Sequence, residues 1–574
     1  MFQQLDKRAF AIRYGPWLAC AFVLLWHSLQ YNFVTDDAYI SFVYSRNLAE
    51  HGQLTFNLGD RVEGYTNFLW TFILGVFMLV GLVPEIMSRV LGTGFAIGTL
   101  LVVFRLTEYV YRKASFWDYV PAAVLALSAG YACWSSGGLE TQMFTFFVAF
   151  ALYAYARADE QPRWLRYATG LLALSAMTRP EGMLVIAVLG VHRVAVNLIR
   201  DRRVKPLRAE WIAVGVFFAI WAPWFLWRWW YYGSFFPNTY YVKAGSEAVH
   251  GFKHGEVTQY GLFYIHQWLQ QTGLLYAFWV VIAGLVVARP KSRRFFVGSA
   301  AAAIAAAYLV YTIRVGGDFM GLHRFIMPLF VIAALGLVFG LALIVEALPK
   351  PELRPYTGPA VAGLVVLVFG YNQIKLTEES LRWGNWKSAH GIDTPAFLWV
   401  YTHDRAQIGK AMKKCFHKGD FSIVGGAGAQ PYFGHMAGVD VFGLVSWDVA
   451  HCDPLRKPRP GHSKWGGNEL LLKQPRHRHK CPERVADNSA RRRWNEVEGG
   501  PPDFIFHCYE IHRSPRPPRL ARCSFWTRSG YSKVTMRIGG MKQQGQYYTF
   551  FVHKGRVAQL RKDCGDMITD VSAR

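Results

Sequence analysis

Long apolar runs separated by short polar loops fill the first two thirds of the chain. A membrane-spanning helix needs about 17 to 25 mostly apolar residues, and about twelve runs are candidates. They lie near residues 16–34, 67–83, 89–111, 118–135, 141–157, 165–178, 181–199, 209–231, 273–289, 296–314, 324–346 and 357–376. The pattern predicts a polytopic α-helical membrane protein.

The pattern changes after about residue 377. Short strand-like pieces at 421–424, 503–506 and 547–552, with a helix near 404–414, replace the long runs. We therefore expect a transmembrane domain over 1–376, whose first outer loop is 35–66, and a C-terminal soluble α/β domain over 377–574. A basic, loop-rich insert is expected at about 453–502.

Clusters of Lys and Arg orient the predicted helices. They precede the first run and recur at 200–208, 289–294 and 350–354, so the positive-inside rule places these segments in the cytoplasm. The loops 35–66, 233–272 and 316–320 and the C-terminal domain then lie outside. An inner N-terminus and an outer tail need an odd number of crossings, and we predict about eleven. The runs 67–83, 89–111 and 165–178 are the weakest spans.

Composition agrees with this class. The chain has 574 residues, of which 52% are hydrophobic and only 18% are charged, whereas soluble domains have about 25% charged residues. The net charge of +25 is concentrated beside apolar runs, where membrane orientation accounts for it. We therefore predict no nucleic-acid partner.

Six of the eight cysteines lie in the C-terminal third (Cys415, Cys452, Cys481, Cys508, Cys523 and Cys564). An even number of cysteines in a domain outside the cytoplasm predicts up to three disulfides. The sequence leaves their pairing open.

Asp36 and Asp37 are the first candidates for chemistry. They lie between the apolar runs 16–34 and 67–83, where ionisable groups are costly and often functional. Two carboxylates there could remove a proton from an acceptor hydroxyl, or could hold a divalent cation against a phosphate. A plain helix N-cap is the structural alternative.

Further polar residues interrupt or flank the apolar runs on the same predicted outer side. Phosphate or sugar binding is one interpretation; structural ion pairs, helix caps and an interfacial aromatic belt are the alternatives. The candidate substrate-binding residues are Arg61, Glu63, Tyr65, Asn67, Glu140, Arg179, Glu181, Asn238, Tyr240, Lys243, Asp318, His323 and Arg324.

Two segments of the tail have weaker signals. His477 to Cys481 hints at metal ligation, but its spacing fits no tetrahedral zinc pattern, and a solvated basic loop is favoured. Gly425 to Ala429 follows a predicted strand and is interpreted as a tight turn.

Several segments recur together as they do in a known family. They include Asp36 to Phe42, Gly59 to Trp70, Gly138 to Thr141, Thr178 to Gly182 and Pro237 to Lys243, with Arg46 to Ala49, Leu54 to Asn57, Gly316 to Met320, Gly443-Leu444 and Pro460 to Lys464. Taken in their order along the chain, these segments resemble the polyprenyl-phosphate-dependent GT-C glycosyltransferases, and particularly the terminal arabinofuranosyltransferases of cell-wall arabinan. Residues 445–448 differ from the shorter polar turn expected of that group.

The resemblance implies a GT-C enzyme of the bacterial plasma (inner) membrane, with its active site and C-terminal domain outside the cytoplasm. It implies a lipid-linked sugar donor of the decaprenyl-phosphoryl-arabinose type. A glycan or glycoprotein would be the acceptor, and the catalytic carboxylate would lie in the loop that holds Asp36 and Asp37. The protein would work in contact with membrane lipid.

Two other functions fit part of the pattern. A transporter or flippase of a lipid-linked glycan would also have many helices and intramembrane charges, but its site would lie near the bilayer midplane on broken helices. Thr178-Arg179-Pro180 is the segment that favours this alternative. The second alternative function is that of a non-catalytic assembly factor with a binding tail.

Overall fold

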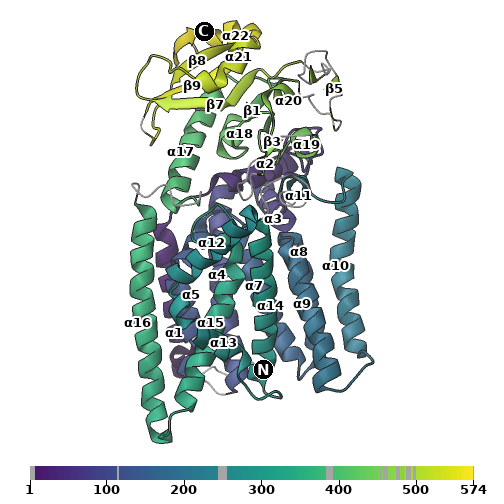
Figure 1. The fold of residues 1–574 in the computed structure, drawn as a ribbon, viewed down its shortest axis with the longest axis vertical. Helices are drawn as coiled ribbons and strands as arrows, with labels where there is room; N and C mark the ends of the chain where they lie inside the picture. Colours follow the sequence, from purple (N-terminus) through teal and green to yellow (C-terminus); the bar gives the residue numbers. More distant parts are fainter. Residues whose placement is uncertain are drawn as a thin grey trace.

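The protein is a helical bundle with a C-terminal sheet domain at one end (Figure 1). The computed structural model describes residues 7–112, 115–243, 255–382, 392–452, 455–456, 463–473, 479, 481, 484–485, 493–494, 500–543 and 545–572.

The bundle is built from helices of very different lengths. They are α1 (Lys7–Gln30), α2 (Asp36–His51), α3 (Phe68–Leu79), α4 (Pro84–Tyr111), α5 (Val120–Leu127), α6 (Ala129–Ser136), α7 (Thr141–Ala158), α8 (Leu165–Thr178), α9 (Glu181–Ala195), α10 (Arg208–Tyr232), α11 (Asn238–Lys243), α12 (Glu256–Gln271), α13 (Leu274–Val286), α14 (Arg293–Val315), α15 (Met327–Glu346) and α16 (Arg354–Leu381).

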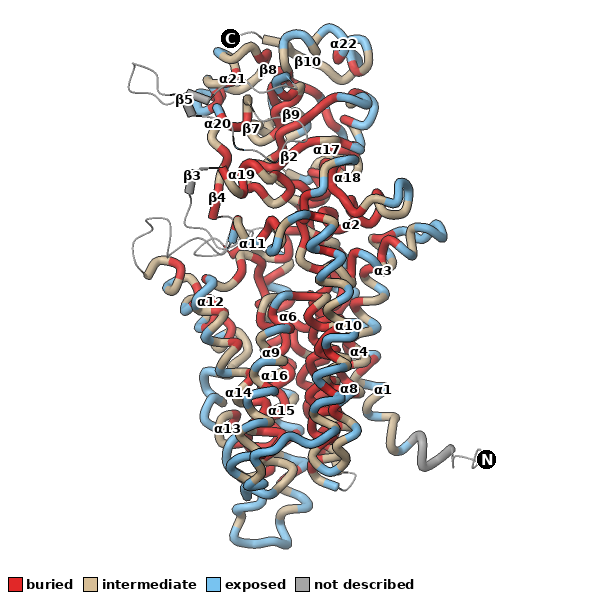
Figure 2. The backbone as a smooth tube through the Cα atoms, turned by 90° about the vertical axis from the view of Figure 1, so that its right-hand side faces the viewer, coloured by how far each residue is buried: buried red, intermediate tan, exposed pale blue. Residues whose placement is uncertain are grey.

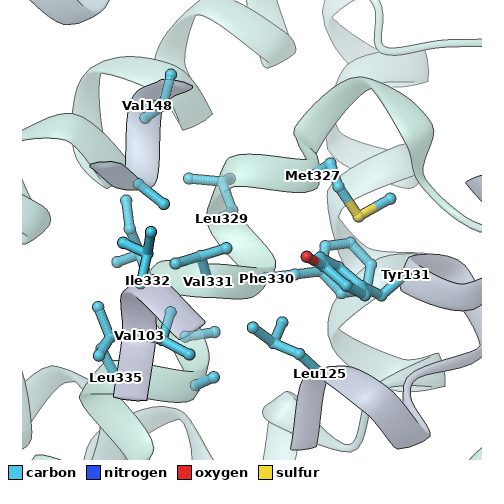
Figure 3. Packing of buried hydrophobic residues seen from close by; sticks show 14 of the residues in the cluster. Val103, Leu125, Tyr131, Val148, Met327, Leu329, Phe330, Val331, Ile332 and Leu335 are labelled. Atoms are coloured by element: carbon cyan, nitrogen blue, oxygen red, sulfur yellow. The ribbon is translucent and has the colours of Figure 1, made fainter. Parts of the chain in front are cut away.

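Helix α15 is the centre of the bundle. It is apolar on every side, as a helix surrounded by other helices must be, and 89% of its most hydrophobic window is buried inside the protein. Figure 3 shows Leu329, Val331 and Ile332 of this helix packed among side chains of its neighbours. Glycines let α13 approach it closely: a Cβ atom on Gly284 would collide with the backbone of Gly336 and Gly340, a small-residue crossing common in membranes.

One of the predicted spans is broken, and one predicted loop contains a helix. The run 118–135 forms α5 and α6, which are separated by the extended backbone of Ser128. The amide freed at Ala129 donates to Oε1 of Gln373 on α16 at 3.0 Å, which offsets the cost of the break. The predicted outer loop 233–272 contains helix α12. This helix meets α13, the predicted run 273–289, at an angle of 92°, and Gly273 between them adopts a positive φ of 70°.

Six described helices are long and apolar enough to cross a membrane, or seven if the bent pair α12–α13 counts as one span. The multi-pass helical membrane class predicted from the sequence is confirmed; the count of about eleven crossings stays a prediction. Helix α16 continues to Leu381, past the predicted domain boundary.

The predicted outer loop 35–66 begins as a helix. Helix α2 covers Asp36–His51 and lies between the bundle and the C-terminal domain (Figure 2). Most of its residues are buried, because it packs on α3 below and on the C-terminal domain above.

The C-terminal domain is built on one mixed six-stranded sheet in the order β10-β8-β9-β7-β1-β2. Strand β1 runs parallel to β2 and β7, and the pairs β7–β9, β9–β8 and β8–β10 are antiparallel. Its main elements are α17 (Pro395–Met412), β1 (Ser422–Val424), α18 (Ala429–Gly434), β2 (Gly438–Asp440), α19 (Trp447–His451), α20 (Asn468–Leu472), β7 (Phe504–His512), α21 (Ser524–Arg528), β8 (Tyr531–Arg537), β9 (Tyr547–His553), α22 (Lys554–Cys564) and β10 (Ile568–Ser572).

The predicted strands and the predicted helix of this domain are present. Two short ribbons, β3 (Leu455–Arg456) with β4 (Lys464–Trp465) and β5 (Arg484–Val485) with β6 (Arg493–Trp494), are the strands described in the insert.

The two ends of the bundle differ in charge. The basic segments 200–208, 289–294 and 350–354 lie at the end away from the C-terminal domain, whereas α2 and α11 lie at the end next to it (Figure 1). This is the arrangement that the basic loops predicted.

The six cysteines of the tail form three disulfides: Cys415–Cys564, Cys452–Cys481 and Cys508–Cys523. Cys20 and Cys133 are free. The predicted number of disulfides is confirmed, and the structure supplies the pairing.

The Cys415–Cys564 bond closes the longest of the three loops, with a sequence separation of 149 residues. Replacing both cysteines by serine should destabilise the C-terminal domain by about 2–5 kcal/mol, because the unfolded chain regains the entropy of that loop. Thermal unfolding of the purified protein measures the change, with Cys20→Ser as the control. Peptide mapping without reductant that yields a different pairing would contradict the assignment.

Candidate functional site

The two carboxylates of the acidic pair have different surroundings. Successive residues on a helix are about 100° apart around its axis, so side chains at adjacent positions do not face each other. Asp36 faces the C-terminal domain, whereas Asp37 faces a group of charged residues at the end of the bundle.

Asp36 is held by the C-terminal domain. Its Oδ1 accepts a hydrogen bond from the backbone N–H of Ala429 at 2.8 Å. Gly428 permits this approach, since a Cβ atom there would collide with Asp36. Gly426 adjoins the same carboxylate, and its Cβ would stand 3.0 Å from Asp36 Oδ2. The glycines interpreted from the sequence as a tight turn thus make room for the Asp36 side chain.

Burial is the main influence on the charge of Asp36. It raises the pKa to about 6 from an ordinary value of 3.8, while the Ala429 N–H and the positive charge of Arg405 act in the opposite direction. Arg405 is itself buried. It lies over the ring of Tyr509 at 4.0 Å and donates to Oε1 of Gln430 at 3.1 Å.

Asp37 is half-buried and accepts no hydrogen bond from the described part of the protein. Burial raises its pKa, and the positive charges of Arg324 and Lys243 oppose that rise. Asp318 and Glu140 are close enough to act on it as negative charges. A carboxylate with no protein donor beside two cations remains available to a ligand.

The cations come from three separate segments of the chain. Lys243 is the last residue of α11, and its side chain is exposed. Arg324 follows α14, and its Nε donates to Oδ2 of Asp318 at 2.9 Å while the guanidinium lies 5.6 Å from the centre of the Trp134 ring. Arg179 follows α8.

Arg179 is the hub of a buried ion cluster. Its Nη1 donates to Oε1 of Glu140 at 2.8 Å, and its Nη2 donates to Oε1 of Glu181 at 3.1 Å. Glu140 also accepts from Nδ2 of Asn67 at 2.9 Å, and Asn67 is bonded to Ser41 on α2. With two carboxylates on one guanidinium, Arg179 is compensated within the protein, as a buried charge must be.

The structure therefore gathers eight of the predicted residues around one point. They are Asp37, Asn67, Glu140, Arg179, Glu181, Lys243, Asp318 and Arg324. We call this group the charged cluster. It is the candidate active site.

The other predicted residues have structural contacts elsewhere. Glu63 pairs with Arg228 at 2.7 Å, and the hydroxyl of Tyr65 meets that of Tyr232 at 2.9 Å. Arg61 is exposed over the ring of Tyr231, and Tyr240 stacks on Phe236. These contacts fit the structural alternatives to substrate binding, which are ion pairing and aromatic anchoring.

Asn238 and His323 are also fixed by protein contacts. Asn238 donates to the carbonyl groups of Gly443, Leu444 and Ser446, so it ties α11 to the C-terminal domain. His323 is hydrogen-bonded to Oε1 of Gln271 at 2.8 Å, and burial lowers its pKa to about 3. It is therefore neutral and cannot neutralise a phosphate.

Sequence reasoning missed the partners that separate Asp36 from Asp37. The Ala429 amide that binds Asp36 lies 393 positions away in the chain, Arg405 comes from the same domain, and no local pattern links either to α2. The run Gly425 to Gly428 was the one signal available, because glycines after a strand permit a close approach.

No group of three or more His, Cys, Asp or Glu side chains that could hold a metal ion occurs among the described residues. Asp37 acts on Asp36 as a negative charge, and a cation held by these two carboxylates stays a prediction. In the predicted tail segment, Cys481 is in a disulfide and His479 contacts Asp60 at 2.9 Å; residues 477, 478 and 480 lie outside the described residues.

The raised pKa of Asp36 allows its structural role to be tested through the pH dependence of stability. Between about pH 4 and 6 the unfolded chain loses this proton while the folded protein keeps it, so the folded state loses stability as the pH rises. Above the folded pKa the penalty is constant at about 3 kcal/mol. Asn at this position has no charge and still accepts the Ala429 N–H.

We therefore expect Asp36→Asn to raise the unfolding temperature at pH 7.5, with an advantage that shrinks toward pH 4.5. Asp36→Ala, which removes the acceptor, should be less stable than Asp36→Asn at both values. Thermal unfolding followed by tryptophan fluorescence measures both variants. A difference in unfolding temperature between Asp36→Asn and the unchanged protein that is independent of pH would contradict the assignment.

Comparisons with known proteins describe what the chain as a whole is similar to. No family model matches the chain. The terminal β-(1→2)-arabinofuranosyltransferase of Mycobacterium tuberculosis (strain ATCC 25618 / H37Rv) is 25% identical over 370 residues, which are 56% of this chain and 55% of that protein. The chain thus spans about half the length of this curated relative.

Solved structures show the fold. ArnT from Cupriavidus metallidurans in the apo state matches with a TM-score of 0.51 and 14% identity, over 94% of this chain and 98% of that one. ArnT bound to undecaprenyl phosphate matches with a TM-score of 0.49 and 16% identity, over 74% of this chain and 85% of that one. The chain therefore shares the fold of apo ArnT and is similar in sequence to an arabinofuranosyltransferase.

Proposed function

We propose that the protein is a membrane glycosyltransferase that moves a sugar from a polyprenyl-phosphate donor to a glycan or glycoprotein acceptor. The observation that carries the proposal is Asp37: a carboxylate without a protein hydrogen bond, beside Lys243 and Arg324, at the junction of the bundle and the C-terminal domain. The similarity to an arabinofuranosyltransferase supports D-arabinofuranose as the sugar. The donor class follows the motifs that resemble the GT-C family.

We propose separate tasks for the residues of the charged cluster. The donor phosphate would lie against Lys243 and Arg324, with its lipid tail among the helices. Asp37 would take the proton from the acceptor hydroxyl, whose oxygen forms the new bond to the anomeric carbon. The bond from that carbon to the phosphate oxygen breaks, and polyprenyl phosphate leaves with the electron pair.

The remaining members of the cluster position these groups. Arg179 joins the end of α8 to Glu140 and Glu181, and Asn67 joins Glu140 to α2. Holding α2 in this way fixes Asp37 relative to the cations, and orientation of this kind is a large part of enzymatic rate enhancement. A divalent cation bound with the donor would have Asp37 rather than Asp36 as its carboxylate ligand. Measuring the release of polyprenyl phosphate with EDTA, and with added Mg²⁺ or Mn²⁺, tests whether such a cation is needed.

The segment that favoured a transporter has a structural explanation. Thr178-Arg179-Pro180 is the tip of the α8–α9 hairpin, and its charge is compensated by two carboxylates in the same cluster as Asp37. We therefore favour the enzyme. An extracytoplasmic orientation in the inner membrane is part of the proposal, because the basic loops lie at the opposite end of the bundle.

Asp37→Asn should lower kcat by about 10²- to 10⁴-fold, the usual contribution of a general base. The measurement is release of polyprenyl phosphate by the purified protein from a panel of polyprenyl-phosphate sugars, with decaprenyl-phosphoryl-arabinose among them. Glu50→Gln, an exposed position on the same helix, is the matched control and should retain normal turnover. Normal turnover by Asp37→Asn would exclude Asp37 as the base.

Lys243→Gln should reduce kcat/KM for the donor by about 10- to 100-fold, because a hydrogen bond between ionised groups contributes about 1.5–3 kcal/mol. Lys243→Arg, which keeps the charge, should recover part of the loss. Steady-state kinetics with a lipid-linked donor measures the effect. Equal kinetics for the Gln and Arg variants would show that the charge of Lys243 does not act on the phosphate.

A further inference from the structure

A groove lies on the outside of the bundle, far from the charged cluster. Its volume is about 720 Å³, and it is bounded by α7, by η2 (Pro162–Trp164), by α8 and by α10. Leu171, Leu174, Val216 and Ile220 form apolar walls, and Arg163 and Arg166 lie at one end. Sites for small ligands have volumes of about 300–1,000 Å³.

The groove has a polar end and an apolar end along α8. Arg163 and Arg166 are at the start of this helix, and Leu174 is two turns further on. The start of α8 is at the basic end of the bundle, and its other end reaches Arg179 of the charged cluster about 20 Å away. A molecule in the groove would thus have its polar part at the membrane surface and its apolar part toward the bilayer interior.

The two arginines have no carboxylate partner within the described chain. Arg163 donates to the amide oxygen of Gln161 at 3.1 Å, and Arg166 donates to the Tyr167 hydroxyl at 3.0 Å. The nearby acidic residues are already engaged: Asp159 pairs with Arg200, and Glu160 pairs with Arg293.

Gly170 keeps the groove open in its middle. A Cβ atom there would touch Ile220 and Val216 across the groove, at 3.6 Å and 3.7 Å. A larger side chain at this position would occupy the space between α8 and α10.

We propose that the groove binds an anionic glycerophospholipid of the leaflet next to the basic loops. Its phosphate would interact with Arg163 and Arg166, with the planar guanidinium groups suited to phosphate oxygens, and an acyl chain would lie along Leu171 and Leu174. Charge complementarity supports this occupant, because no Asp or Glu is among the described residues that line the groove. The proposal concerns a lipid held as part of the structure and does not depend on the transferase reaction.

Native mass spectrometry of the delipidated protein in detergent tests the proposal. Dioleoyl-phosphatidylglycerol should bind at least about ten times more tightly than dioleoyl-phosphatidylcholine, a difference of about 1.4 kcal/mol. The double variant Arg163→Gln, Arg166→Gln should lose this preference. Gly170→Leu, which keeps both charges, should weaken binding of both lipids.

The double variant Arg289→Gln, Lys291→Gln is the matched control. It removes the same charge from an exposed loop at the same end of the bundle, and the lipid preference should be unchanged. Equal retention of phosphatidylglycerol by the Arg163 and Arg166 variant would overturn the proposal. Displacement of phosphatidylglycerol by an equimolar amount of undecaprenyl phosphate would overturn it too, because the groove would then belong to the lipid carrier.

Discussion

The need to pair buried charges organises the end of the bundle that meets the C-terminal domain. A charge without a partner there costs several kcal/mol, so nearly every ionised side chain in the region is matched: Arg179 with Glu140 and Glu181, Arg324 with Asp318, and Glu63 with Arg228. Asp37 and Lys243 are the charges left without a protein hydrogen bond in the described part of the cluster. The paired residues act as the frame, and the unpaired ones remain available to a ligand.

That frame depends on the C-terminal domain as much as on the bundle. Helix α2 carries Asp37 on one side. On its other side, Asp36 accepts a hydrogen bond from the Ala429 N–H, and Arg46 donates to the Tyr432 carbonyl. In the loop after α2, Asn57 and Gly438 exchange two hydrogen bonds of 2.9 Å. Asn238 does the same for α11, whose last residue is Lys243. The acid and the cation of the cluster are thus both held by the domain above them, so its position sets the distance between them.

The sequence predicted the class of fold and most of the residues that gather in the charged cluster, because both depend on local signals. Apolar runs mark spans, and clusters of polar residues at their ends mark one face. It could not tell that the run 118–135 breaks at Ser128, because the amide freed there is satisfied by Gln373 from a distant helix. Nor could it distinguish Asp36 from Asp37. Both open the same helix, and only the folded domain decides which carboxylate meets Ala429 and which meets the cations.

Helices of different lengths lead from the basic end of the bundle to the charged cluster. Helix α8 has 14 residues and spans about 21 Å before it reaches Arg179, whereas the 23 residues of α14 span about 34 Å before the loop that holds Asp318 and Arg324. The longer helix exceeds the roughly 30 Å of a bilayer's hydrocarbon core. Because both helices begin beside basic residues and end at the same charged cluster, the cluster lies at the end of the bundle that α2 and the C-terminal domain cover. A ligand bound there would meet the apolar helices on one side and the polar domain on the other.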